Sequence, residues 1–478
     1  MSKIKTIAIV GAGVAGLSAA IRCAVKGHRV VVFEQGINAG GVSVSWNRKG
    51  YHFEGGMHWL VGSSPRIGSI YRRWKEVGAL QDNNPISFRD PVYVYRRDGV
   101  CLNLWRDIDK LEAEMLEFDP SDNKATKRFC RTIRQAISFF CAPGNARELL
   151  LKIVRTPVFA LKLPGILKKN SGELTSMFSN PYLRGLVNNM VDPEQNAISL
   201  VYTMATFLGG DSGYPKGGST TMVQNMLERA ESLGVEIRYR SKVERVLVRD
   251  GRAIGVRCNG ELFPADDVIV TTDTVRALDT MFETPLKERW IKKLHVFKNP
   301  QTCMFLSLGV ESELEGLHSG LRIETKYPTN IALTEHKSLW ISIYRASETG
   351  YAPEGCSALT VILFGDSYDF WKSARELGHY KDAKEKVADF VIKVLENELP
   401  QLKDKIKVID LATPLTYERY CGNFRGAWMS MWPKGVLPVS VPATCRSVKG
   451  LHFAGFRTQL SGGLPVALNS GYKSASAV

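Results

Sequence analysis

Residues 6–34 read TIAIVGAGVAGLSAAIRCAVKGHRVVVFE, and this stretch decides the fold. Residues 7–10 are a short apolar run, long enough for one buried strand. A helical apolar pattern follows and stops at Gly27, where a helix is expected to end. A second apolar strand over residues 29–33 leads directly into an acid, Glu34. The order strand, helix, strand and acid predicts a βαβ unit in a parallel sheet.

Three glycines occupy the turn between the first strand and the helix. Gly11, Gly13 and Gly16 form the pattern G-x-G-x-x-G. One makes the tight turn, one lets the backbone approach a pyrophosphate, and one lets the helix pack on the strand. The helix N-terminus offers free N–H groups and a partial positive charge to phosphates. Glu34 can accept a hydrogen bond from a ribose hydroxyl, so the stretch predicts dinucleotide binding without separating NAD from FAD.

The next glycines extend the pattern beyond this unit. Gly40 and Gly41 are adjacent, and residues 50–59 read GYHFEGGMHW. Adjacent glycines so soon after the acid suggest a second close backbone approach to the ligand. This arrangement resembles the two-domain flavoproteins that include phytoene desaturases, carotenoid isomerases, retinol saturases and amine oxidases. Many amine oxidases and phytoene desaturases have arginine after the glycine pair, where this chain has Val42, so the segment is more similar to the isomerase and saturase branch.

Two later segments carry the resemblance over nearly the whole chain. Residues 214–219, YPKGGS, open a predicted helix, and a V-x-x-V pattern begins at Val243. Residues 453–471, FAGFRTQLSGGLPVALNSG, are similar to the C-terminal FAD motif of the family. The usual acid after A-G is absent, and Phe456 and Arg457 stand there. We expect either that Arg457 meets the phosphates instead or that the motif is degenerate.

The resemblance implies an α/β fold. A Rossmann-like FAD-binding domain with a parallel sheet would be interleaved with an α+β substrate domain that carries a mixed sheet and a helical cap. The expected FAD-binding parts are residues 1–66, 205–298 and 431–478, and the expected substrate-domain parts are residues 67–204 and 299–430. The FAD contacts that the resemblance implies are Gly11, Gly13, Ala15, Gly16, Glu34, Gly40, Gly41, Gly55, Gly56, Met57, His58, Val243, Gly455, Gly463, Leu464 and Pro465.

His58 is the one candidate catalytic residue, because the resemblance places it beside the isoalloxazine. It could stabilise charge or move a proton. The other interpretation, which we favour, is a histidine that hydrogen-bonds the backbone near the flavin. Trp59 could pack on the ring or the substrate, whereas Tyr417 and Tyr420 are more readily explained as structural tyrosines. FAD would carry the redox step, so no metal site, catalytic triad or pair of acids is expected.

Three functions remain open at this point. The first is a flavoenzyme that desaturates, saturates or isomerises carbon–carbon bonds of a hydrophobic isoprenoid or carotenoid-like substrate. The second is a flavin amine oxidase, which would need an aromatic cage near the flavin. The third is a non-enzymatic prenyl- or lipid-binding escort protein of the same fold. The retained glycine motifs and Glu34 argue against the third function.

The composition limits the cellular compartment and the classes of binding partner that we expect. The chain has 478 residues, a net charge of +15 and nine cysteines, an odd number without a C-x-x-C pair. This usage predicts a reducing compartment, and neither a signal peptide nor a membrane span is evident, so we expect a cytoplasmic protein. The expected partner is a hydrophobic small-molecule substrate. No motif indicates nucleic acid, and the sequence does not predict an oligomeric state.

A strongly apolar stretch, residues 139–167, is threaded with basic residues. We expect Pro157 and Pro164 to break it into short pieces. Basic residues among exposed apolar ones are typical of a peripheral contact with an anionic membrane surface. The alternative is a pair of substrate-domain helices whose apolar faces are core.

Overall fold

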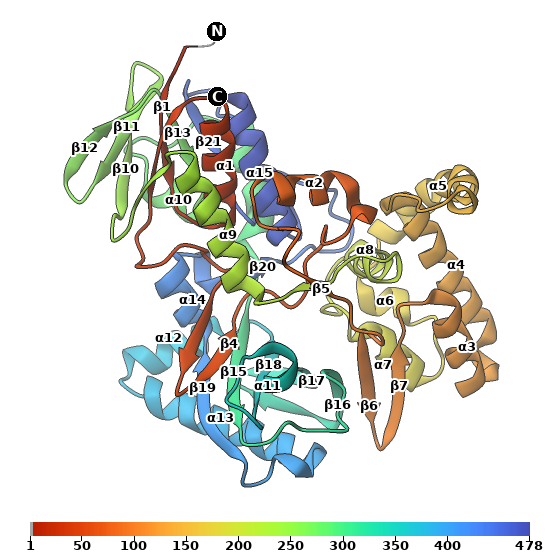
Figure 1. The fold of residues 1–478 in the computed structure, drawn as a ribbon. Coiled ribbons are helices and arrows are strands. Elements are labelled where there is room, and N and C mark those ends of the chain that lie inside the picture. Colours follow the sequence, from red (N-terminus) through yellow and green to blue (C-terminus); the bar gives the residue numbers. More distant parts are fainter. Residues whose placement is uncertain (1–2) are drawn as a thin grey trace.

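The computed structural model describes residues 3–478, without the side chains of residues 326–328. A five-stranded parallel sheet, in the order β21-β13-β1-β2-β9, forms the upper part of the molecule in Figure 1. Its strands are β1 (Thr6–Val10), β2 (Arg29–Phe33), β9 (Glu236–Arg238), β13 (Asp267–Val270) and β21 (Leu451–Phe453). The predicted βαβ unit is confirmed, with β1 and β2 as neighbours.

Side chains alternate between the two faces of this sheet, as the pleat requires. Ile7 and Ile9 face a buried cluster with α1 (Val14–Val25), α9 (Gly218–Ser232) and α15 (Leu464–Ala477). Ala8 and Val10 face the other way, into a cluster shared with a small antiparallel sheet. That sheet consists of β10 (Val243–Arg249), β11 (Arg252–Cys258) and β12 (Glu261–Pro264). The parallel sheet is therefore the middle of three layers.

A seven-stranded mixed sheet, β19-β15-β18-β17-β16-β6-β7, forms the lower part of Figure 1. All its neighbours are antiparallel except β16 and β6. One face, which includes Leu306 and Val361, packs on α12 (Tyr368–Glu376) and α13 (Tyr380–Glu398), whereas Phe305 and Ile362 point to the opposite face. The strands are β6 (Tyr93–Arg97), β7 (Val100–Leu104), β15 (Cys303–Val310), β16 (Gly320–Ile331), β17 (Thr334–Arg345), β18 (Ser357–Phe364) and β19 (Ile406–Ala412). The predicted α/β fold with a parallel and a mixed sheet is confirmed, while the domain boundaries stay predictions.

Helices gather on the right in Figure 1, between β7 and α9 in the chain. They are α3 (Ile108–Phe118), α4 (Asn123–Phe140), α5 (Ala146–Leu167), α6 (Ser171–Thr175), α7 (Pro181–Asn188) and α8 (Ala197–Leu208). The expectation that Pro157 and Pro164 break this stretch is wrong, because α5 continues through both. Both prolines are exposed, so water can solvate the carbonyl groups that lose their partners. Across residues 3–478, no helix has the combined length and apolarity of a bilayer-spanning segment.

The remaining elements are short connections. They are β3 (Ser45–Arg48), β4 (Tyr51–Glu54), α2 (Gly68–Glu76), β5 (Ile86–Ser87), β8 (Tyr214–Pro215), α10 (Thr274–Thr280), β14 (Pro300–Gln301), α11 (Ala346–Thr349), α14 (Pro414–Cys421), β20 (Met429–Ser430) and the 3₁₀ turns Pro65–Ile67, Pro120–Asp122, Arg289–Lys298, Pro400–Leu402 and Phe424–Gly426.

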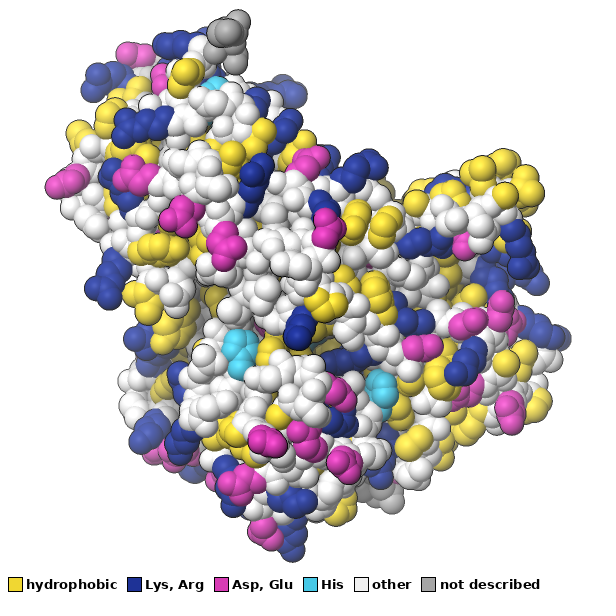
Figure 2. Space-filling model, in the orientation of Figure 1, with side chains coloured by type: hydrophobic (Ala, Val, Ile, Leu, Met, Phe, Trp, Pro, Cys, Tyr) yellow, Lys and Arg dark blue, Asp and Glu magenta, His cyan; other side chains and the backbone are white. Residues whose placement is uncertain are grey.

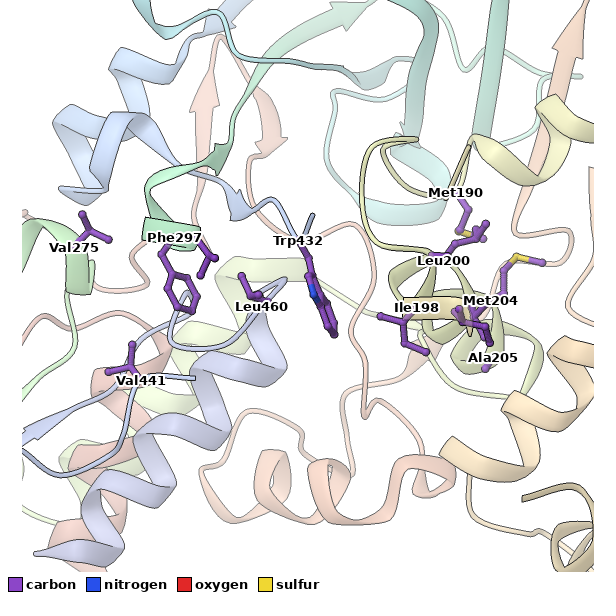
Figure 3. Packing of buried hydrophobic residues seen from close by; sticks show 14 of the residues in the cluster. Met190, Ile198, Leu200, Met204, Ala205, Val275, Phe297, Trp432, Val441 and Leu460 are labelled. Atoms are coloured by element: carbon purple, nitrogen blue, oxygen red, sulfur yellow. The ribbon is translucent and has the colours of Figure 1, made fainter. Parts of the chain in front are cut away.

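One buried cluster joins the helical part to the parallel sheet. Figure 3 shows Trp432 in the middle of it, between a group that includes Phe297 and Leu460 and a group on and before α8. Backbone bonds strengthen this junction, since Asn196 N–H donates to the Trp432 carbonyl over 2.7 Å. The two regions therefore share one apolar core.

A substitution at Gly16 tests the close packing of α1 on β1. A Cβ at this position would overlap the Gly11 carbonyl oxygen, whereas a Cβ at Gly165, on the exposed side of α5, would meet nothing within 4 Å. We expect Gly16→Ala to lose about 1–3 kcal/mol of unfolding free energy, because overpacking must displace backbone. Gly165→Ala is the matched control and should gain up to about 1 kcal/mol from helix propensity. Denaturant unfolding checks both, and equal midpoints for the two variants would contradict the predicted role of Gly16.

Candidate functional site

The turn between β1 and α1 has the geometry of a phosphate cradle. Gly11 lies at φ +103°, a conformation that favours glycine. Gly13 is the N-cap of α1, and no side chain caps the helix there. The first N–H groups of α1 are therefore available to an anion at the positive end of the helix dipole.

The second glycine pair lies directly against the first turn. Gly40 forms a parallel bridge with Gly13, and its N–H donates to the Ala12 carbonyl over 2.9 Å. Gly40 and Gly41 both have positive φ, at +118° and +62°. Bare backbone from two segments thus lies side by side here, and its close approach to a ligand stays a prediction.

Glu34 stands at the carboxyl end of β2 and is buried. Its two carboxylate oxygens accept from Ala12 N–H over 2.8 Å and from Gly36 N–H over 2.7 Å. Its carbonyl accepts from Ser241 N–H, two residues before Val243. The Val243 side chain is buried in the core, and the contact between its backbone and a ligand stays a prediction. The contact between Glu34 and a ribose stays a prediction.

A buried carboxylate, Glu54, orders the segment 55–57. It accepts from the N–H groups of Gly56 and Met57, both over 3.2 Å, and from the Ser219 hydroxyl over 2.6 Å. The Tyr214 hydroxyl also donates to it, over 3.0 Å. A Cβ at Gly55 or Gly56 would overlap Trp46 or the Val42 carbonyl, so both positions require glycine.

The C-terminal motif supplies a second uncapped helix. No side chain caps α15 at Gly463, and Pro465 lies in its first turn, as expected. The Gly455 N–H donates to the Ser470 hydroxyl over 3.0 Å. A Cβ at Gly471 would overlap the Ala15 carbonyl, so α15 packs tightly on α1. Leu464, the first residue of α15, is half-buried next to this contact.

Arg457 does not meet phosphates in this structure, and that expectation is wrong. It is buried, and its guanidinium pairs with the Asp273 carboxylate over 2.5 Å. It also donates to the Ser430 hydroxyl over 3.0 Å and to the Phe297 carbonyl. With its donors engaged by protein groups, Arg457 acts as a structural link between β13, β20 and the C-terminal motif.

His58 follows the glycine segment and enters an aromatic group. Its ring lies 5.7 Å from that of Phe305, nearly parallel, and 6.2 Å from that of Trp428. Both ring nitrogens are buried and have no hydrogen-bond partner among the described residues. The favoured expectation of a backbone hydrogen bond is therefore wrong. Burial, and then the charges of Arg322 and Arg89, lower the pKa of His58 from 6.5 to about 3, so the ring is neutral.

The His58 side chain lines a cavity between the mixed sheet and the helical part, together with Trp59. The cavity volume is about 40 Å³. Tyr417 donates to the Gly55 carbonyl over 3.0 Å and is a structural tyrosine, as expected. Tyr420 is 64% exposed and lies away from the cavity lining.

Comparison with known proteins agrees with this geometry. The family model described as flavin containing amine oxidoreductase matches residues 14–478. The chain belongs to this family. It is a flavin-dependent oxidoreductase.

Individual relatives show which members of the family this chain is similar to. Prolycopene isomerase 1 of an Oncidium hybrid cultivar is 27% identical, over 94% of this chain and 79% of the relative. The 4,4'-diapophytoene desaturase of Staphylococcus haemolyticus is 23% identical, over 99% of this chain and 98% of the relative. Cyclohexylamine oxidase from Brevibacterium oxydans has a similar structure, with a TM-score of 0.63 at 16% identity over 99% of this chain and 98% of that one.

The residues present fit a flavin dinucleotide. The helices α1 and α15, which both have uncapped N-termini, pack on each other, and glycine backbone lies beside the N-terminus of α1. The two orphaned nitrogens of His58 lie at the far end of the segment 55–57. These features call for a ligand that carries phosphates at one end and a ring at the other.

Several residues of the site escaped the sequence analysis. Glu54 lies within the motif at residues 50–59, but its role depends on a hydrogen bond from Ser219, 165 positions away. Asp211 holds the loop after Trp59 by accepting from Gly62 and Ser64 N–H groups over 2.7 and 2.8 Å. The arginines around the cavity come from separate segments, so no local pattern identifies them.

The neutral state of His58 predicts a pH effect on stability. The unfolded chain binds a proton near pH 6.5, whereas folded His58 binds one only near pH 3, so stability falls as the pH drops through this window. At pH 5 the loss from this residue is about 2 kcal/mol. We expect the flavin-free His58→Phe variant to lose about 2 kcal/mol less than the wild type between pH 8 and pH 5. Urea unfolding at both pH values measures this, and parallel losses would contradict the buried neutral state.

Proposed function

We propose that this flavoprotein binds FAD and acts on carbon–carbon bonds of a hydrophobic isoprenoid. Desaturation, saturation and redox-neutral isomerisation are the three forms that this activity can take. FAD would lie along the glycine cradle, with the pyrophosphate between α1 and α15, the adenosine toward Glu34 and Val243, and the isoalloxazine toward His58. With the proposed interleaved domains, this cradle would lie at the junction of the two sheets.

One observation carries the proposal. Glycine backbone at positive φ recurs along the cradle, and the relatives that align over nearly the whole chain include a prolycopene isomerase and a diapophytoene desaturase. The partly buried ring of Trp428 beside His58 would supply an apolar surface for a polyene.

Bound FAD would supply the redox chemistry at its ring. The chain would exclude water and orient the substrate with the aromatic group. His58 is neutral, so it would offer one nitrogen donor and one acceptor rather than a positive charge. Its role would then be to hold a ring or a proton at a fixed position.

The amine oxidase alternative is favoured by one feature and opposed by another. Phe305 and Trp428 provide aromatic faces of the kind that bind cations. However, Arg89 and Arg322 line the cavity beside His58 and would repel a protonated amine there. We therefore place the isoprenoid activity first.

An absorbance spectrum of the purified protein tests the proposal first. We expect flavin bands that bleach with anaerobic dithionite, and released cofactor that chromatographs as FAD. Polyenes and amines are then added anaerobically to the oxidised and the reduced protein. Bleaching or recovery of the bands with a polyene, or its geometric isomerisation, supports the proposal, whereas a response to amines alone supports the alternative. A spectrum that stays flat after FAD is added would leave lipid escort as the function.

We also propose that α5 contacts an anionic membrane surface. Apolar side chains recur along it at helical spacing and are exposed, with Leu150 at 67% and Ile153 at 66%. None of the five basic residues between positions 152 and 169 forms an ion pair with a described residue. Figure 2 shows this apolar tip at the upper right with basic side chains beside it. An amphipathic basic helix of this kind suits a negatively charged bilayer.

Vesicle flotation tests the membrane contact. Wild-type protein should float with vesicles containing about one third phosphatidylserine and much less with pure phosphatidylcholine, since surface charge adds about 1 kcal/mol per basic residue. Leu150→Asp with Ile153→Asp should reduce binding at least about 10-fold, because apolar burial is lost. Leu262→Asp, at an equally exposed leucine on β12, is the matched control. Equal flotation of both variants would contradict the proposal.

A further inference from the structure

Three arginines line the cavity beside His58. Arg89 follows β5, Arg106 follows β7, and Arg322 lies on β16. None of them forms an ion pair with a carboxylate in the described part of the chain. Positive charge near a half-enclosed cavity, without a partner, is costly unless a ligand completes it.

Arg322 is the most buried of the three, at 9% exposure. It donates to the Asn189 carbonyl over 3.2 Å and to its neighbour's carbonyl, Leu321, over 2.9 Å. Its guanidinium stacks 4.2 Å from the centre of the Trp340 ring. These contacts use Nε and Nη1 and leave Nη2 without a described partner. Burial lowers the pKa of Arg322 to about 10, so the group stays charged at neutral pH.

Arg89 is half-buried, and its guanidinium makes no hydrogen bond to the described residues. It lies 5.8 Å from the centre of the Tyr344 ring. Arg89 and Arg322 line one cavity together with His58.

Arg106 differs from the other two because its donors are occupied. It binds four carbonyl oxygens, those of Arg89, Phe207, Asp211 and Ser212, at 2.8–3.0 Å. Its nearest acids are Asp90 and Asp211, which offset part of its charge. Arg106 therefore fixes the Arg89 backbone, while Arg89 and Arg322 keep donors directed at the cavity.

We propose that the substrate is an apolar carboxylic acid whose carboxylate is held between Arg89 and Arg322. This inference rests on the proposed function and names the substrate class of its site. A carboxylate accepts paired hydrogen bonds from guanidinium groups with matching geometry. The cavity of about 40 Å³ has room for roughly three water molecules, which is the size of such a head group.

The cavity belongs to the substrate rather than to the pyrophosphate of the cofactor. Among the residues expected to contact FAD, only His58 lines it. The phosphates are expected at α1 and α15, whereas Arg322 lies on the mixed sheet. With the carboxylate anchored here, the apolar chain would run along Trp59 and the aromatic group.

Binding of matched ligands to the flavin-containing protein tests the proposal. The probes are farnesoic acid, its methyl ester, farnesol and farnesyl phosphate, and tryptophan fluorescence quenching measures the dissociation constants at pH 7.5. We expect the acid to bind at least about 10-fold more tightly than the ester and the alcohol. Equal binding of acid and ester overturns the proposal, and tighter binding of the phosphate overturns the choice of a carboxylate.

Variants locate the anion. Arg89→Met removes a charge without removing a hydrogen bond, and should reduce the preference for acid over ester at least about 10-fold. Arg322→Met should do the same, with folding checked by thermal unfolding. Arg184→Met is the control, because Arg184 also donates to a carbonyl, that of Phe178, but lies outside the cavity lining. An unchanged preference in Arg89→Met overturns the proposal.

The test of the carboxylate site can fail or succeed independently of the test of the proposed function. Binding is measured without turnover, and flavin bleaching by a polyene is measured on its own. An arginine-dependent preference for the acid, without any flavin response to polyenes or to a polyene carboxylic acid, supports the anion site and removes the isoprenoid activity. A flavin response to a polyene, without a binding preference for the acid, supports the isoprenoid activity and removes the anion site.

Discussion

The buried carboxylate of Glu54 is the interaction on which the site depends. It stands at the end of β4, accepts hydrogen bonds from the segment 55–57, and binds Ser219 at the start of α9. No cation pairs with it among the described residues, so backbone N–H and hydroxyl groups alone hold the charge. This one carboxylate therefore fixes the relative positions of three elements, which are the hairpin that ends in β4, the segment 55–57 and α9.

Electrostatics divide the site into two chemically different ends. Helix N-termini at α1 and α15 offer positive potential from backbone dipoles. The cavity beside His58 offers full charges from arginine side chains on apolar walls. The histidine between them remains neutral because burial and those same arginines oppose its protonation. Both ends of the site are therefore electropositive, and aromatic rings surround the histidine between them.

The parts of the fold that were predictable are those that depend on local spacing. Gly11, Gly13 and Gly16 predict the cradle from sequence. The tight turn, the backbone approach to phosphate and the packing of helix on strand all depend on positions within six residues. The prediction that Pro157 and Pro164 break the helix is wrong. Solvent exposure decides whether a helix tolerates proline, and exposure cannot be read from the sequence. Arg457 misled because its partner Asp273 is 184 positions away. Arg89 and Arg322 meet only when β16 pairs with β6, which no local pattern predicts.

The strand order has a consequence for how the protein is made. The parallel sheet takes its edge strand, β21, from residues 451–453, and α15, which packs on α1, ends at Ala477. β1, at residues 6–10, is therefore synthesised long before β21 and α15. Long-range parallel pairing of this kind is slow and leaves strand edges open meanwhile. The ligand capture proposed here, which needs both α1 and α15, would consequently follow the synthesis of both helices.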